Sequence, residues 1–173
     1  MRDTESQLRE EIVGLLPRLR RFARTLARNA PDADDVVQTA VERALARLDQ
    51  LRPGSPLSSW LFGIVRNAWI DEVRARGRQG KIFAPEELGA QVGEESLGTV
   101  ADTLAVEAAL ARLPDEQRIA IGLVLVEGLS YKEAARVMEI PIGTLTSRLA
   151  RGREALQEML RGADASDATG AVS

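Results

Sequence analysis

The chain has 173 residues and a formal net charge of −3, and its content of 45% hydrophobic and 28% charged residues is typical of a globular protein. It contains no cysteine and no histidine, which excludes disulfides, most metal sites and catalysis by a thiolate or an imidazole. It also lacks a phosphate-binding glycine loop. We therefore expect no enzymatic activity, no catalytic residues, no metal and no cofactor.

The first residues, MRDTESQLREE, are acidic and polar, unlike a secretory signal peptide. No apolar run approaches the length that is needed to cross a bilayer. These two features predict a cytoplasmic protein with no membrane insertion.

The N-terminal region predicts two amphipathic helices. In the first, apolar residues recur at steps of three and four, and Pro17 either kinks the helix or opens its second half. Its apolar residues are Leu8, Ile12, Leu15, Leu19, Phe22 and Leu26. In the second, Asp32 after Pro31 is a candidate N-cap. Its inward stripe is Val37, Ala40, Val41, Ala44 and Leu48.

A loop around Pro53 and Pro56 separates these helices from a third one, which runs from about Leu57 to Arg76 and carries both tryptophans. From residue 77 to about 101 the pattern changes to glycine, glutamate and isolated apolar residues, which predicts a flexible acidic linker. Helical periodicity then returns at Leu104 and continues past Pro114.

The segment LSYKEAARVMEIPIGTLTSRLARGREAL, residues 129–156, predicts two helices with a turn at Glu139-Ile140-Pro141. Ser130 followed by Glu133 predicts a capping box, and the helix that it starts has its inward residues at Ala134, Ala135 and Met138. The second helix has an apolar face with Leu145, Leu149, Gly152, Leu156 and Leu160, and a polar face with Thr144, Ser147, Arg148, Arg151, Glu154 and Ala155. Hydroxyls and arginines on the first turns suit a recognition helix in the DNA major groove, although a plain helical hairpin with solvated arginines has the same pattern.

The charges are unevenly distributed along the chain. Residues 1–81 carry fifteen basic and eleven acidic residues, residues 82–111 carry six acidic residues and no basic one, and residues 112–161 carry eight basic and seven acidic residues. Because affinity for DNA comes largely from neutralised phosphates, so weakly basic a protein should bind duplex DNA poorly by itself. We expect it to work inside a larger assembly.

No β pattern occurs, so the predicted fold is all-α, with two small helical domains at 5–77 and 102–161, a linker at 78–101 and a disordered tail at 162–173. Three segments in this order resemble a bacterial RNA polymerase sigma factor of the extracytoplasmic-function (ECF) group. They are DADDVVQTAVERAL at 32–45, SSWLFGIVRNAWIDEVRAR at 58–76, and LPDEQRIAIGLVLVEGLSYKEAARVMEIPIGTLTSRLARGREAL at 113–156. The resemblance covers about residues 10–160.

The resemblance implies a role for each segment. The first would bind core RNA polymerase through one face with Asp34, Asp35, Gln38 and Glu42. The second and its preceding loop would bind the minus-ten element through Arg52, Trp60, Arg66, Asn67, Asp71 and Arg74. Trp60 also fits a core position, whereas the Asn67 carboxamide is suited to paired hydrogen bonds with a flipped base.

The third segment would bind the minus-thirty-five element through Thr144, Thr146, Ser147, Arg148 and Arg151. The family usually has a basic residue where this chain has Thr146, and the loss of one phosphate contact should weaken DNA binding without abolishing it. The acidic linker, with Glu86, Glu87, Glu94 and Glu95, fits either a solvated connection or a segment that occupies polymerase channels built for nucleic acid.

The resemblance thus implies an alternative sigma factor that binds core RNA polymerase, directs promoter recognition and transcription initiation, is a monomer when free, and is controlled by an anti-sigma factor. Two alternatives remain open. One is a stand-alone helix-turn-helix transcriptional regulator, which would bind DNA tightly without polymerase. The other is a sigma-mimicking adaptor that binds an anti-sigma factor, against which Asn67, Arg148 and Arg151 argue.

Overall fold

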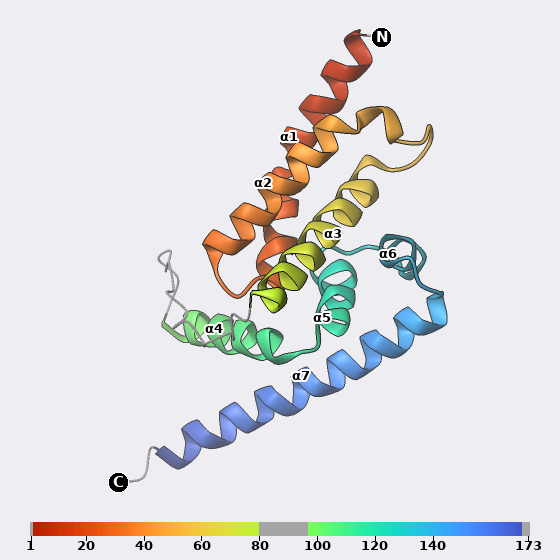
Figure 1. Ribbon diagram of the computed structural model, residues 1–173. Helices are drawn as coiled ribbons and strands as arrows, with labels where there is room; N and C mark the ends of the chain where they lie inside the picture. The colour runs from red at the N-terminus through yellow and green to blue at the C-terminus, as the bar shows by residue number, and fades with distance from the viewer. Residues whose placement is uncertain (1, 80–96, 171–173) are drawn as a thin grey trace.

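The computed structural model describes residues 2–79 and 97–170, and over these ranges the chain is built of helices and short turns, which confirms the predicted all-α class (Figure 1). The N-terminal half contains α1 (Arg2–Leu26), α2 (Ala30–Ala46), the short η1 (Leu48–Gln50) and α3 (Leu57–Arg78). The C-terminal half contains α4 (Leu97–Arg112), α5 (Asp115–Ile121), η2 (Gly122–Val126), α6 (Tyr131–Met138) and α7 (Ile142–Gly170).

In the N-terminal half, α1, α2 and α3 pack side by side around one apolar interior. Leu19, Phe22 and Leu26 of the predicted α1 stripe are fully buried, and the Phe22 ring meets Phe62 of α3 edge-on with 5.4 Å between centroids. Pro17 lies inside a continuous α1. The burial of these large side chains supplies most of the driving force that holds the three helices together.

The start of α2 differs from the sequence prediction. Asn29, not Asp32, is the N-cap, because the Asn29 side-chain oxygen accepts a hydrogen bond of 2.8 Å from the Asp32 N–H. Pro31 occupies the first turn of the helix, where its missing N–H costs nothing. Asp32 is thereby left to form an ion pair with α3.

In the C-terminal half, the predicted helix-turn-helix is present as α6 and α7. Ser130 and Glu133 form the predicted capping box, with hydrogen bonds of 2.9 and 3.2 Å. The turn is made at Glu139, whose φ of 55° is left-handed. The inward residues predicted for α6, namely Ala134, Ala135 and Met138, are buried, as are Leu145, Leu149 and Gly152 of α7.

Two helix ends differ from the predicted boundaries. Helix α4 begins at Leu97, inside the range assigned to the linker, and α7 continues to Gly170 through the range assigned to a disordered tail. The residues from 162 are rich in alanine, which favours helix once α7 has been nucleated. The acidic linker residues Glu86, Glu87, Glu94 and Glu95 lie outside the described residues.

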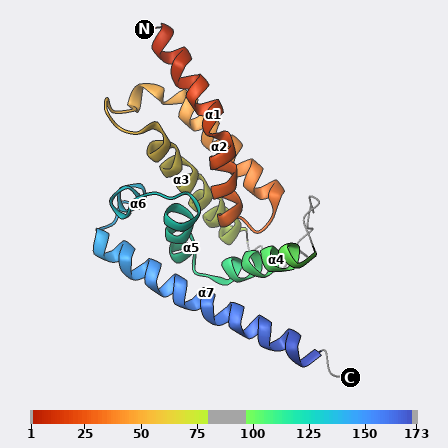
Figure 2. The same cartoon turned by 180° about the vertical axis from the view of Figure 1, so that it is seen from behind.

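The two halves lie against each other (Figures 1 and 2). Helices α1 and α3 contact α5, η2 and α6, and one cluster of buried apolar residues runs through both halves. We call this contact the seam. Helix α4 contacts both α1 and α7, and Leu113, Ile121 and Leu149 form a second, smaller cluster in the C-terminal half.

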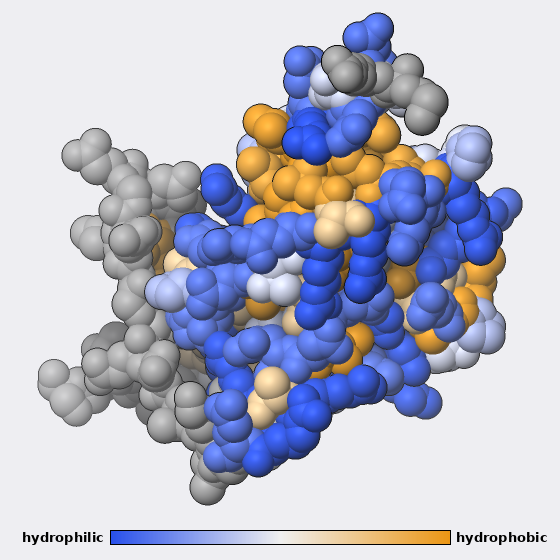
Figure 3. Space-filling view, turned by 45° about the horizontal axis from the view of Figure 1, so that its top comes forward, coloured by the Kyte–Doolittle hydropathy of each residue, from blue (hydrophilic) through white to orange (hydrophobic). Residues whose placement is uncertain are grey.

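The surface is largely polar. The face in Figure 3 is mostly hydrophilic, with one hydrophobic area beneath the N-terminal end of α1. Large exposed apolar side chains are spread over several helices, from Val13 on α1 to Ile142 on α7. Among the described helices, none combines the length and the hydropathy that a bilayer crossing requires.

Candidate functional site

Helix α2 presents the acidic face that the sequence predicted. Asp34, Asp35, Gln38 and Glu42 are all exposed, while the residues behind them are buried against α1 and α3. The Gln38 Nε2 donates a hydrogen bond of 3.3 Å to Glu42 Oε1, so the two side chains share one stripe of the surface. These positions form a solvent-facing patch of three carboxylates that is suited to a basic partner surface.

An ion-pair network fixes α2 against α3. Asp32 pairs with Arg76 of α3 at 2.7 Å, and Arg76 also pairs with Glu72 at 2.8 Å. The hydrogen bond from Arg76 lowers the pKa of Asp32 below its ordinary value, and the same bond raises the pKa of Arg76. The acidic face of α2 is therefore held in a fixed orientation relative to α3.

On α3 the predicted minus-ten residues differ in exposure. Asn67, Asp71 and Arg74 are exposed, and Arg52 is exposed in the preceding loop. Trp60 is half-buried and packs against the apolar core, which agrees with the core position that the sequence analysis gave as an alternative to DNA binding. The Asn67 carboxamide and the Arg74 guanidinium are thus accessible to a partner, whereas most of the indole supports the helix.

Two arginines that contact these residues set their orientation. Arg66 Nη1 donates a hydrogen bond of 3.2 Å to Asn67 Oδ1, so the Asn67 Nδ2 atom lies on the side of the carboxamide away from this contact. Arg43 of α2 forms an ion pair of 2.7 Å with Asp71. Sequence reasoning missed Arg43, because a pair that joins two different helices leaves no local pattern.

On α7 the predicted minus-thirty-five residues form the exposed start of the helix. Thr146, Ser147 and Arg151 are exposed and Thr144 is half-exposed. The Thr146 hydroxyl donates a hydrogen bond of 2.9 Å to the Ile142 carbonyl, so it is held along its own helix. A hydroxyl, not a cation, therefore occupies this position.

Arg148 is held by a residue that the sequence did not single out. Its Nη2 lies 2.9 Å from Glu116 Oε2 of α5, and the Arg148 side chain keeps only 23% of its surface exposed. The pair holds the guanidinium against α5, beside the predicted minus-thirty-five residues. Glu116 lies in the first turn of α5, where acidic residues are common because they interact favourably with the helix dipole. Its sequence position therefore did not indicate a pair with Arg148.

The described residues contain no cluster of metal ligands. Within residues 2–79 and 97–170 there is no group of three Asp or Glu side chains that could hold a metal ion. The predicted site residues lie instead on three helix faces, on α2, α3 and the start of α7. That distribution suits large partners with extended surfaces.

Comparison with known proteins accounts for both halves. Residues 12–79 match the family described as Sigma-70 region 2, and residues 103–156 match Sigma-70, region 4. The chain is 39% identical over 155 residues to the ECF RNA polymerase sigma factor EcfG of Rhodopseudomonas palustris, covering 88% of this chain and 84% of that one. It is 38% identical to the ECF RNA polymerase sigma factor SigM of Mycobacterium tuberculosis, over 82% of this chain and 71% of the relative.

Solved structures give the same result. The sigma factor RpoE from Bartonella quintana, crystallised with the anti-sigma factor NepR, is similar with a TM-score of 0.77 and 35% identity, covering 90% of this chain and 97% of that one. CnrH, solved in complex with the cytosolic domain of CnrY, is similar with a TM-score of 0.68 and 25% identity, covering 90% and 88%. With a predicted region 2 face on α2 and α3 and a predicted region 4 face on α7, this chain belongs to the ECF RNA polymerase sigma factors.

Proposed function

We propose that this sigma factor divides its work among three helix faces. The acidic face of α2 binds core RNA polymerase, the Asn67 face of α3 binds the minus-ten element, and the start of α7 binds the minus-thirty-five element. The chain supplies promoter specificity and has no catalytic activity of its own. The observation that supports this most is that residues of the three faces stay accessible while the apolar side of each helix is buried.

The energetics favour a shared task with the polymerase. Extrusion of a base costs a few kcal/mol, and capture in a stacked pocket returns roughly 1 to 3 kcal/mol per base. With Trp60 half-buried, the minus-ten face has little aromatic surface to offer. The domain should therefore capture bases that are already opened on the polymerase.

Run-off transcription from a genomic fragment library, with core polymerase and with or without the chain, tests the function. Transcripts that start at a common sequence only when the chain is present are the expected result. Tight footprinting of a duplex by the chain alone would favour a stand-alone regulator instead. No chain-dependent transcript from any fragment would contradict the proposal.

Charge reversal tests the polymerase face. Asp35→Arg with Glu42→Arg should abolish binding to core polymerase, because both side chains are exposed on the same stripe of α2. Glu154→Arg with Glu158→Arg is the matched control, since it changes the net charge equally at exposed positions of α7. Equal core affinity of the two variants would show that the α2 face is not the docking surface.

Two substitutions test the DNA faces on assembled holoenzyme. Asn67→Ala should relax selectivity at the minus-ten element while binding to core polymerase survives. The reason is that the Asn67 carboxamide is exposed on α3 and does not belong to the acidic face of α2. Thr146→Lys should steepen the salt dependence of minus-thirty-five binding by roughly 0.9 in log–log slope, the value for one added phosphate contact. An unchanged slope would place Thr146 away from the DNA backbone.

We also propose that an anti-sigma factor controls this chain. The support is that a similar sigma factor was crystallised with the anti-sigma factor NepR, and that CnrH was solved with the cytosolic domain of CnrY. Affinity purification of the tagged chain from its own cells, followed by addition of each recovered protein to the run-off assay, tests this. A protein that binds the chain and stops transcription is the expected result, and recovery of polymerase subunits alone would contradict it.

A further inference from the structure

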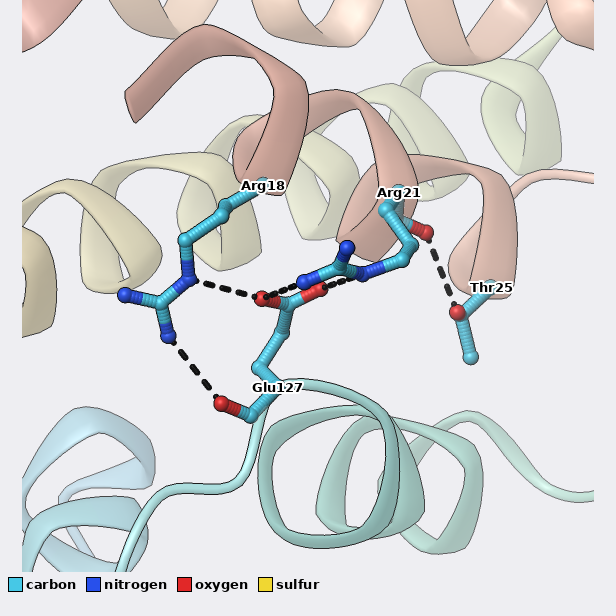
Figure 4. Close-up of polar contacts among 4 residues, drawn as sticks. All are labelled: Arg18, Arg21, Thr25 and Glu127. Atoms are coloured by element: carbon cyan, nitrogen blue, oxygen red, sulfur yellow. Dashed lines mark hydrogen bonds and ion pairs between the residues drawn. The ribbon is translucent and has the colours of Figure 1, made fainter. Parts of the chain in front are cut away.

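One buried carboxylate lies at the seam between the two halves, beside the apolar cluster that both halves share. Glu127, directly after η2, has a side chain that is 0% exposed, and both of its carboxylate oxygens accept hydrogen bonds from α1 (Figure 4). Arg18 Nε donates to Oε2 at 3.1 Å, and Arg21 donates from Nε to Oε1 at 2.8 Å and from Nη2 to Oε2 at 3.0 Å. Arg18 Nη2 also donates to the Glu127 carbonyl at 3.0 Å. We call this group the clasp.

The rest of the seam is close but imperfectly satisfied. A Cβ on Gly122 would lie 3.0 Å from the Phe22 ring, so α1 and η2 meet here without room for a side chain. Nearby, the Arg118 guanidinium of α5 lies 5.9 Å from the ring centroid of Trp69 on α3. The buried Arg118 Nε and Trp69 Nε1 find no hydrogen-bond partner among the described residues. Buried donors without a partner cost free energy, which water would return if the seam opened.

The closed chain is too compact to contact both promoter elements at once. This step rests on the proposed function, in which α3 and α7 read elements centred about 25 base pairs apart, or about 85 Å along B-DNA. A compact chain of 173 residues has a radius of gyration of only about 16 Å. The seventeen residues 80–96 connect the halves and can span at most about 60 Å, enough for the halves to separate and reach both elements.

We infer that the clasp is a latch that keeps the free chain closed and unable to engage both promoter elements. The balance of the ion pairs suits this role: full separation rehydrates all three charges and offsets most, but not all, of the lost attraction, so the clasp favours the closed chain by a small margin. Arg18 and Arg21 keep 37% and 55% of their side-chain surface exposed, so competing charges can reach them. The latch therefore favours the closed form of the free chain and can be released by a charged surface.

The absence of cysteine makes opening measurable by energy transfer between dyes on introduced cysteines. Val13→Cys on α1 and Gln157→Cys on α7 place labels at exposed positions, one in each half, outside the seam and the three functional faces. In this background Glu127→Gln removes the charge and keeps the shape. We expect a roughly tenfold rise in the ratio of open to closed chain, the scale for a partly screened buried ion pair.

Arg18→Gln with Arg21→Gln provides a second route to the same result with less risk to folding, because both side chains reach the rim of the seam. Arg20→Gln with Arg24→Gln is the matched control, since it removes the same charge from exposed positions of the same helix. Opening in both clasp variants but not in the control supports the latch. Equal energy transfer in all three variants and in the parent chain overturns it.

A disulfide lock links the latch to transcription. A Cβ at Gly122 would lie 3.3 Å from Thr25 Cγ2, so Thr25→Cys with Gly122→Cys places two thiols close together across the seam. The added Cβ also crowds the Phe22 ring and loosens the seam in the reduced form, whereas the disulfide of the oxidised form holds the halves together. The oxidised chain should lose run-off transcription and the reduced form of the same chain should regain it. Equal transcription by both forms overturns the latch while the sigma function stands. If neither the reduced form nor the wild-type chain transcribes, the proposed function fails, and the dye measurement still decides whether the clasp closes the chain.

Discussion

The interiors of the two halves and the seam between them are built differently. Inside the N-terminal half, Leu19, Phe22 and Phe62 are fully buried among apolar neighbours. At the seam, the buried groups include the charged side chains of Arg118 and Glu127. Separation of an apolar interior only exposes apolar surface to water, whereas a seam that also contains buried ion pairs and donors such as Trp69 Nε1 regains part of the cost as hydration when it parts. The contrast indicates that each half is permanent and that their contact is reversible.

The largest expected change in stability comes from a substitution in the apolar interior of the N-terminal half. Leu61→Ala removes a side chain that is 1% exposed and should lower the free energy of unfolding by about 2 to 5 kcal/mol. Val13→Ala is the control, because Val13 is 64% exposed and its truncation should cost within about 0.5 kcal/mol. Urea unfolding of both variants measures the difference. Similar midpoints would mean that α3 is not held by its apolar interior.

A glycine pair compares an interior with the seam more directly. A Cβ on Gly152 would lie 2.7 Å from Ile121 Cδ1 inside the C-terminal half, so the Ile121 methyl must move. After the roughly 1 kcal/mol that alanine gains over glycine in a helix, Gly152→Ala should lower the free energy of unfolding by up to about 2 kcal/mol. Gly122→Ala makes a similar clash with Phe22, but across the seam, where separation of the halves relieves it. It should therefore reduce energy transfer between the labelled halves and cost less stability. The contrast fails if Gly122→Ala destabilises the chain as much as Gly152→Ala does and leaves energy transfer unchanged.

The smallest expected effect lies at the start of α6. Ser130→Ala removes one half of the capping box and should cost about 1 kcal/mol in thermal or urea unfolding. The hydrogen bond from the Ser130 N–H lowers the pKa of Glu133, so the charged carboxylate stabilises the fold above its unfolded pKa of about 4.3, and this contribution is lost as the pH falls. Stability should therefore fall more steeply for the wild type than for Glu133→Gln between about pH 5 and pH 3. Parallel pH curves would contradict this coupling.

The sequence predicted the features that depend on neighbours along the chain. The apolar stripe of α1, the capping box at Ser130 and the inward face of α7 all follow from spacings of three and four residues. The end of α7 at Gly170 was not predicted. A segment of small and polar residues without an apolar stripe is typical of a disordered tail. The predicted N-cap of α2 was also wrong, because Asn29 and Asp32 both have side chains that can cap a helix.

Contacts between residues that are distant along the chain could not be predicted from the sequence. The clasp joins Arg21 to Glu127, and no spacing along the chain marks such a pair. The same holds for Arg148 and Glu116, which lie on different helices. The candidate site residues were found through their order in three motifs, and their roles on polymerase and promoter remain predictions that the variants above test.

The pairing of Arg148 with Glu116 has a consequence for how promoter preference can change over generations. Because Glu116 of α5 pairs with this guanidinium, a substitution at position 116 should alter the proposed base-reading surface without changing any residue proposed to face the DNA. We expect Glu116→Gln to shift the bases selected near the minus-thirty-five element in a randomised promoter pool, whereas an unchanged consensus would rule this out. Two lineages with identical recognition helices are then free to diverge in the genes that they switch on.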